Sequence, residues 1–264
     1  MMRQAPVPQQ IAPKWMEQLI ALDSRKSSEN TFPIRRIIQD AERIIANSND
    51  GLIILNSYKT IMYANTILGR AEFVIDAHEK IKSLSNSHEL DLMYAGFLWR
   101  LKEIDRLRTT LNDFDYTQKL SENDVAVLLF LNINIVNFFK LSEVREYVVH
   151  SNPRIQTSIF GELSTKFTEL AKRMSLSQKD VDLRYDFALN HLISKGHSPE
   201  RNLVSSNPNG SIAIHFQIDA PLDERVDLSW EIGEKIIEEF GDDTQSDLIT
   251  FGVCGLRQTI SDAN

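Results

Sequence analysis

The chain is poor in the residues that mark extracellular and metal-binding proteins. It has one cysteine, Cys254, among 264 residues, which excludes an internal disulfide and any zinc site built from several thiolates. Pro6, Pro8 and Pro13 interrupt the N-terminus, where a secretory signal needs a continuous apolar run. The sequence therefore predicts a reducing, cytoplasmic setting.

Long hydrophobic runs are also missing. The most apolar segment, Val125–Phe139, is shorter than the ~20 apolar residues of a spanning helix, and Asn132, Asn134 and Asn137 interrupt it. We expect this segment to be a buried element of a soluble core, and we expect no membrane partner.

No motif for a known catalytic or cofactor chemistry is present. The chain lacks a Walker-type phosphate loop, a dinucleotide fingerprint and a Gly-x-Ser-x-Gly nucleophile motif. Its six histidines are scattered, without the spacing of metal ligands. We expect neither a cofactor nor a metal ion.

An excess of positive charge is lacking as well. The net charge is −8, and the segment from Asp180 to the end holds 16 acidic and 6 basic residues. The preceding part is close to neutral, and its basic clusters are interrupted by acidic residues. A nucleic-acid-binding domain needs a broad positive surface, so nucleic acid is a disfavoured partner.

Helical spacing of apolar residues dominates the first three quarters of the chain. Ile34, Ile37, Ile38 and Ala41 follow Pro33 at the spacing of one helix face. Similar patterns come in pairs, whose second members begin near Glu72, Glu103 and Ser142. Two helix starts have capping-box spacing, Ser121 with Asp124 and Ser177 with Asp180. Such spacing is typical of repeated helical hairpins.

The segment Tyr63–Leu84 resembles part of a tetratricopeptide repeat. Tyr63 precedes the turn, Leu68 and Gly69 lie in it, and an amphipathic second helix follows. Val74 stands where that family has a small residue, and the terminal proline is missing. The resemblance covers at most about residues 33–150, and it implies a concave surface that binds a protein or peptide.

A second resemblance predicts a different fold for part of this region. Asp50–Asn65 is similar to the opening strands of a PAS sensor domain. Gly69 lies closer to Asn65 than that pattern requires, and no matching strands follow. The helical interpretation is therefore preferred.

Near residue 200 the hydrophobic period changes from that of a helix to that of a strand. Ile212, Ile214, Phe216 and Ile218 alternate with more polar residues, an amphipathic helix follows, and Ile249–Val253 alternate again. We predict a mainly α protein with a smaller α+β part, in which a helical-hairpin array precedes an αββαβ module with a three-stranded sheet. The expected organisation is a flexible tail at 1–13, a helical domain at 14–175, an acidic α+β domain at 176–256 and a second tail at 257–264.

Polar residues on the central strand allow two interpretations. His215, Gln217 and Asp219 share one face, and Cys254 on a neighbouring strand can complete a nucleophilic set with His215 and Asp219. A half-buried sheet needs such a polar row regardless of function. We favour the second interpretation and assign no catalytic residue.

The last helix and the turn after it carry the candidate partner-binding residues. These acidic residues form either a solubilising surface or a contact for a basic partner: Glu231, Glu234, Glu238, Glu239, Asp242 and Asp243. The preferred hypothesis is a non-enzymatic adaptor or scaffold that binds a protein or peptide. An inhibitor or immunity-type protein that caps a basic target is the alternative, and a small hydrolase or transferase is the third. A homodimer through a free sheet edge is a further expectation.

Overall fold

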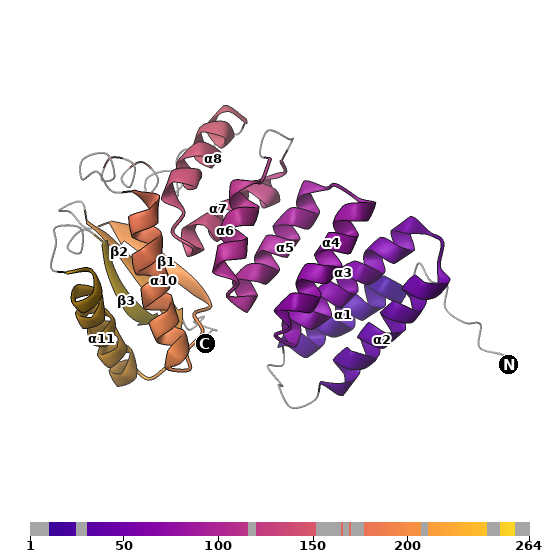
Figure 1. Cartoon of the computed structure of the whole chain (residues 1–264), viewed down its shortest axis with the longest axis horizontal. Helices are drawn as coiled ribbons and strands as arrows, with labels where there is room; N and C mark the ends of the chain where they lie inside the picture. Colours follow the sequence, from indigo (N-terminus) through magenta and orange to yellow (C-terminus); the bar gives the residue numbers. More distant parts are fainter. Residues whose placement is uncertain are drawn as a thin grey trace, which may run out of the picture. The chain divides into compact units, whose positions relative to one another are not determined.

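The fold is mainly helical with one small sheet (Figure 1). The computed structural model describes residues 11–24, 31–115, 120–151, 165, 169, 177–206, 211–241 and 249–256. Contacts divide the chain into two compact units, Met1–Phe114 and Asp115–Asn264, called here the N-terminal and C-terminal units. The predicted fold class is confirmed.

The N-terminal unit consists of helical hairpins, as predicted. Its described helices are α1 (Ile11–Ser24), α2 (Phe32–Asn47), α3 (Gly51–Ile67), α4 (Ala71–Leu84), α5 (His88–Leu101) and α6 (Ile104–Asn112). Helix α1 begins at Ile11, inside the segment expected to be a tail. The region similar to a PAS domain is helix α3, whose first turn is capped by the Asp50 carboxylate accepting hydrogen bonds from Leu52 and Ile53.

A polar cluster joins three helices of the N-terminal unit. The Arg100 guanidinium donates to both carboxylate oxygens of Asp23, and the Tyr63 hydroxyl donates to Asp23 at 2.9 Å. These residues lie near the C-terminal ends of α5, α1 and α3. The three helices therefore run in the same direction, as alternate members of an antiparallel array must.

The C-terminal unit combines helices with the sheet. Its elements are α7 (Glu122–Asn134), α8 (Phe138–Ser151), α10 (Gln178–Ser194), β1 (Arg201–Ser206), β2 (Ile212–Ile218), α11 (Leu222–Phe240) and β3 (Ile249–Gly255). Both predicted capping boxes are present at α7 and α10. The apolar spacing of Ser158–Met174 predicts a further helix, and Asn207–Gly210 predicts a turn. Both segments lie outside the described residues, except for Thr165 and Glu169.

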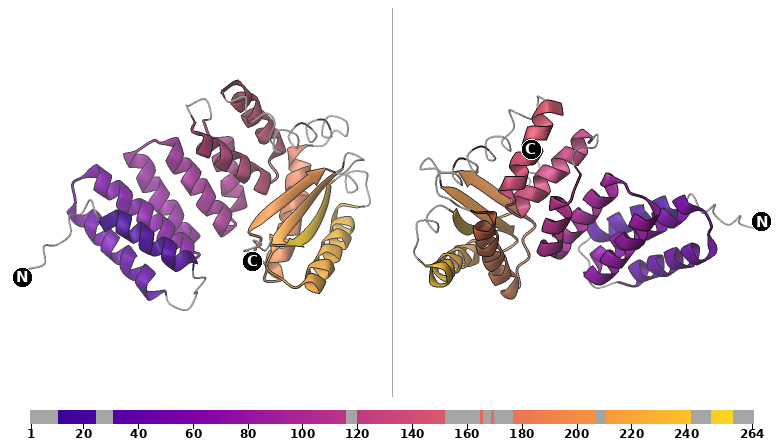
Figure 2. Two further views of the ribbon diagram at one scale, coloured as in Figure 1. Left: turned by 180° about the vertical axis from the view of Figure 1, so that it is seen from behind. Right: turned by 45° about the horizontal axis from the view of Figure 1, so that its top comes forward.

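The sheet has the strand order β1-β2-β3 (Figure 2). Strands β1 and β2 are antiparallel, whereas β2 and β3 are parallel and need a crossover, which α11 supplies. Phe216 of β2 contacts Tyr185 of α10 and Phe251 of β3 through their rings, with centroid distances of 5.6 and 6.2 Å. Helix α10 thus covers the apolar face of the sheet, and α11 packs beside α10 against β3.

An asparagine junction attaches α7 to the sheet. The backbone N–H of Asn202 in β1 donates to Asn134 Oδ1 at 2.7 Å, and the Asn202 amide donates to the Asn134 carbonyl at 2.5 Å. The Tyr185 hydroxyl donates to that carbonyl at 2.7 Å. Helix α7 therefore belongs with the sheet, and the units divide after Phe114 rather than at the expected boundary of 175/176.

Candidate partner-binding surface

Helix α11 carries most of the predicted acidic residues. Leu228, Ile232 and Ile236 form its buried face, spaced every four residues as predicted, and Gly241 with φ 82° follows its last residue. Seven acidic and two basic residues lie between Leu222 and Phe240. The acidic residues form two groups that differ in what they contact.

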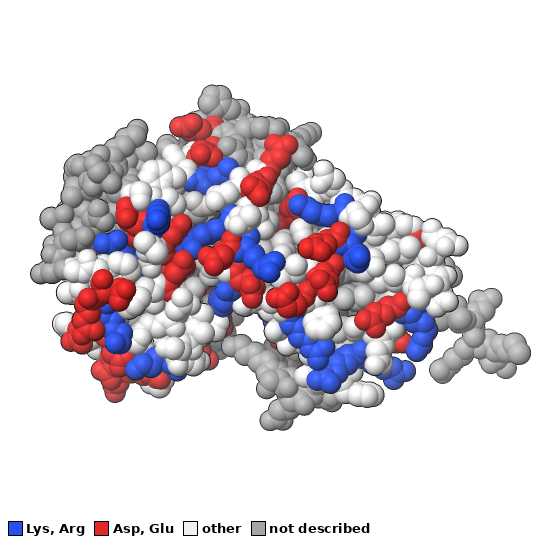
Figure 3. Space-filling view, in the orientation of Figure 1, with Lys and Arg blue, Asp and Glu red and all other residues white. Residues whose placement is uncertain are grey.

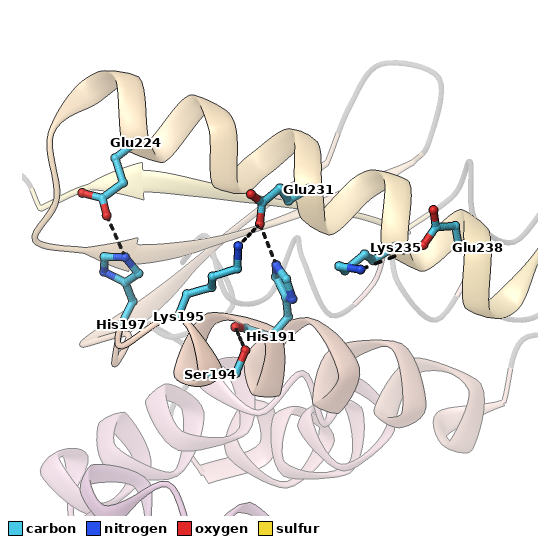
Figure 4. A network of polar contacts seen from close by, with 8 residues as sticks. All are labelled: His191, Ser194, Lys195, His197, Glu224, Glu231, Lys235 and Glu238. Carbon is cyan, nitrogen blue, oxygen red and sulfur yellow. Dashed lines mark hydrogen bonds and ion pairs between the residues drawn. The ribbon is translucent and has the colours of Figure 1, made fainter.

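One group pairs with α10 and the turn that follows it (Figure 4). The Glu231 carboxylate lies 2.8 Å from Lys195 Nζ and 3.1 Å from His191 Nε2, and Glu224 lies 3.1 Å from His197 Nε2. Hydrogen bonds from Lys195 and then His191 lower the pKa of Glu231. Glu231 thus forms a contact between α11 and the C-terminal end of α10, and its predicted contact with a partner stays a prediction.

The other group faces solvent. Glu234, Glu238 and Glu239 are exposed, and so are Asp223 and Asp227, which the sequence interpretation did not single out. Lys235 lies 4.0 Å from Glu238, while Asp223, Asp227, Glu234 and Glu239 have no ion-pair partner in the described part of the chain. Asp242 and Asp243 lie outside the described residues. Figure 3 shows acidic side chains over α11, with basic side chains among them.

Helix α11 also exposes a line of large apolar side chains that the sequence interpretation missed. Trp230 is 71% exposed and Leu222 is 65% exposed, and Val226 and Ile237 are exposed as well. Gly233 lies between Trp230 and Ile237 on the same side. We call this set the apolar stripe: Leu222, Val226, Trp230, Gly233 and Ile237. Its four-residue spacing parallels that of the buried face, so the same periodicity could have revealed it.

The apolar stripe and part of the exposed acidic group are neighbours on the helix. At about 100° per residue, the stripe spans an arc of about 80°. The acidic row, defined as Asp223, Asp227, Glu234 and Glu238, occupies the next 60° or so. Helix α11 therefore presents an apolar surface bordered along its length by negative charge.

The second candidate set, on the sheet, does not form a catalytic constellation. The register places His215 opposite Gly252 and Gln217 opposite Cys254, while Asp219 lies beyond the end of β2 and is exposed. No hydrogen bond joins His215 to Cys254 or Asp219 within the described ranges. Burial raises the pKa of the Cys254 thiol, which opposes formation of a nucleophilic thiolate.

The polar row on this face is less solvated than predicted. Gln217 is fully buried, and its amide donates to the Gly255 carbonyl at 3.0 Å while its oxygen accepts from Arg201. Ala213 on the same face is also buried. The Gln217 side chain on the central strand β2 thus links Arg201 of β1 to the backbone of β3.

The N-terminal unit holds a groove between α1 and α2. Its volume is about 460 Å³, and it combines apolar side chains with Gln18, Arg36 and Asp40. Three arginines of this unit pair with nearby carboxylates: Arg43 with Asp40, Arg106 with Glu103 and Arg108 with Asp105. A cluster of three potential metal ligands does not occur among the described residues. In the same ranges, every helix is too short or too polar to cross a membrane.

Comparison with known protein families, characterised proteins and solved structures finds no match for this chain.

Proposed function

We propose that this protein is a non-enzymatic adaptor or scaffold that binds another protein in the cytoplasm, with α11 as its principal contact element. The observation that supports the proposal is the exposed apolar stripe, above all Trp230 with 71% of its surface exposed. Contiguous apolar surface is costly to leave in water, and on soluble proteins it marks interaction sites more often than chance.

The composition of the surface supports a protein partner. Tryptophan is enriched among the residues that dominate binding energy, particularly where neighbouring contacts exclude water. Burying one large apolar side chain contributes about 1.5–3 kcal/mol. The four large side chains of the stripe therefore supply enough apolar surface to anchor a partner, while the acidic row provides orientation and faster association.

The N-terminal unit contributes a second contact in this proposal. The groove between α1 and α2 offers Trp15 and Ile37 for an apolar group, with Arg36 and Asp40 beside them. Elsewhere in this unit, the segment Tyr63–Leu84 resembles part of a tetratricopeptide repeat. A binding groove with a few polar groups among apolar walls suits a peptide side chain.

An inhibitor or immunity-type protein that caps a basic target is the second candidate. The excess of five negative charges on α11 favours it. Capture of the target only at low salt distinguishes it from the adaptor, since screening weakens exposed charge pairs and leaves apolar contacts intact.

Affinity capture from native lysate tests the proposal. Wild-type protein, Trp230→Ala and the matched control Phe73→Ala, which removes an exposed aromatic ring from α4, are used as bait after thermal unfolding has shown that all three are folded. We expect at least one captured protein to be retained by the control and lost with Trp230→Ala. Retention of every captured protein by Trp230→Ala contradicts the proposal.

A further inference from the structure

We propose that the partner of α11 is an amphipathic helix with lysine or arginine along one border of its apolar face. This inference rests on the proposed function and specifies the chemistry of the partner. It draws on three features of α11: the length of the apolar stripe, the open position at Gly233 and the acidic row.

The dimensions of the stripe match a helix lying along it. From Leu222 to Ile237 the stripe extends about 22 Å at 1.5 Å per residue. Leu222, Val226 and Trp230 follow one another at intervals of four residues, which forms a ridge of the kind that packs into the groove of another helix. A partner helix of about four turns covers this length, with apolar side chains at spacings of three and four residues.

Gly233 provides a gap in that ridge. A Cβ atom built at this position has no neighbour within 4 Å, so the space above it is open. Glycine is unfavourable inside a helix, and here the glycine lies between the exposed side chains of Trp230 and Ile237. A large side chain of the partner fits between them and brings the two helices close together. Gly233 thus leaves room for a side chain of the partner helix.

The acidic row selects the charge of the partner. Asp223, Asp227 and Glu234 have no ion-pair partner in the described part of the chain, and the row borders the apolar stripe on one side. A lysine or arginine border on the partner neutralises it. A second copy of α11 brings like charges together, and an anionic membrane surface repels the row, so both fit less well.

An extended partner strand is less suitable than a helix at this site. Such a strand needs free backbone groups on the outer edge of β3. The Val253 N–H on β3 already donates to Ser229 Oγ of α11 at 2.9 Å. The available surface is therefore the side-chain surface of α11.

A display library of patterned 18-residue peptides tests the inference. Leucine occupies the apolar positions at helical spacing, and lysine, glutamate, glutamine and serine are encoded equally at the flanking positions. The full chain is the bait, and the same selection is run against Trp230→Ala. We expect lysine to be enriched over glutamate on one border, and a synthetic consensus peptide to lose about tenfold or more in affinity for Trp230→Ala.

Two further variants test the geometry and the charge. Gly233→Leu fills the gap and at the same time favours the helix, so we expect weaker peptide binding, by about tenfold, in a protein at least as stable as wild type. The double variant Glu234→Lys, Glu238→Lys should bind the lysine peptide more weakly than wild type. It should bind the same peptide with glutamate in place of lysine more tightly than wild type.

The outcomes separate this inference from the proposed function. If the selected peptides depend on Trp230 but show no excess of lysine, or if no peptide binds, the inference of a basic partner helix is wrong. The proposed adaptor function is then tested separately by the lysate experiment. Unchanged binding by Gly233→Leu overturns the proposed helix packing. A free chain that sediments as a dimer and is dissociated by Trp230→Ala identifies a second copy as the occupant and also overturns the inference.

Discussion

At the scale of single residues, Gly252 of β3 leaves little room for a side chain. A Cβ atom added there would lie 3.0 Å from His215 Nδ1 and 3.3 Å from His215 Cε1. His215 therefore occupies the space that a side chain at residue 252 needs. His215 and residue 252 therefore depend on each other for space.

We expect substitutions at Gly252 and His215 to have coupled effects on stability. Gly252→Val should lower the free energy of unfolding by about 1–3 kcal/mol, since the added methyl groups collide with the imidazole ring. In the double variant with His215→Ala, much of the loss should be regained. Urea unfolding of the two single variants and the double variant measures the coupling, and strictly additive effects would show that the contact is unimportant.

Asp23 links stability to pH in the N-terminal unit. Hydrogen bonds from Arg100, and a weaker one from Tyr63, lower the pKa of Asp23 against the opposing effect of burial. A carboxylate whose pKa is lowered by folding contributes stability above its unfolded pKa. That contribution disappears as the pH falls through the folded pKa.

Asp23→Asn should therefore destabilise the protein at neutral pH by about 1–3 kcal/mol, because two charged hydrogen bonds are lost. The difference from wild type should shrink below about pH 4, where an ordinary carboxyl group is protonated. Thermal unfolding at several pH values checks this, with the exposed Asp76→Asn as the control. A constant difference across the whole pH range contradicts it.

At the scale of secondary-structure elements, short-range signals were reliable. Capping boxes place Ser121 and Ser177 three residues before their carboxylate partners, Asp124 and Asp180, so both are visible in the sequence. The buried face of α11 was likewise predictable, because Leu228, Ile232 and Ile236 repeat every four residues. These features depend on residues only three or four positions apart, so the sequence alone is enough to predict them.

Removing one cap tests the contribution of such a signal. Ser177→Ala should destabilise the protein by about 1 kcal/mol, since the Asp180 N–H then loses its acceptor at the start of α10. Ser83→Ala, at an exposed serine of α4, is the matched control and should change stability little. Chemical denaturation measures both, and equal effects would show that the cap has no special role.

The exposed residues of α11 show where element-level prediction was incomplete. Glu231 was grouped with the solvent-facing acidic residues, and the structure pairs it with His191, which is 40 residues earlier in the chain, and with Lys195. Tertiary packing decides which acidic side chains remain free. The sequence could not show that packing, since nothing in the spacing of α11 relates it to α10.

At the scale of the whole molecule, the division after Phe114 was the feature least visible in the sequence. Helices α7 and α8 have the same hydrophobic rhythm as the helices before them, so periodicity assigned them to one array. Asn134 and Asn202, which are 68 residues apart, instead join α7 to β1. A contact between residues so far apart in the chain produces no periodic pattern in the sequence.

A double-mutant cycle measures this junction. Asn134→Ala should cost about 1–3 kcal/mol, because the buried Asn202 N–H loses its acceptor. Asn202→Ala should cost less, about 1 kcal/mol, because the Asn134 carbonyl keeps the hydrogen bond from Tyr185. The substitutions remove two different hydrogen bonds of the same contact, and losing either loosens the packing of α7 on β1 that supports the other. The double variant should therefore cost less than the sum of the two. Additive costs contradict a shared junction.

Expression of the two units separately tests the division. We expect residues 1–114 and residues 115–264 each to show cooperative thermal unfolding, since each has its own buried core. The comparison is a pair of fragments cut at the expected boundary, 1–175 and 176–264. The second of these should fail to fold, because it lacks Asn134 and the rest of α7. Cooperative unfolding of 176–264 alone would contradict the importance of α7.

The crossover position of α11 has a consequence for local opening of the sheet. Because α11 connects β2 to β3, and Ser229 holds the Val253 N–H, β3 cannot separate from β2 without disturbing this helix. A ligand that clamps α11 must therefore slow amide hydrogen exchange along β3, at positions it never touches.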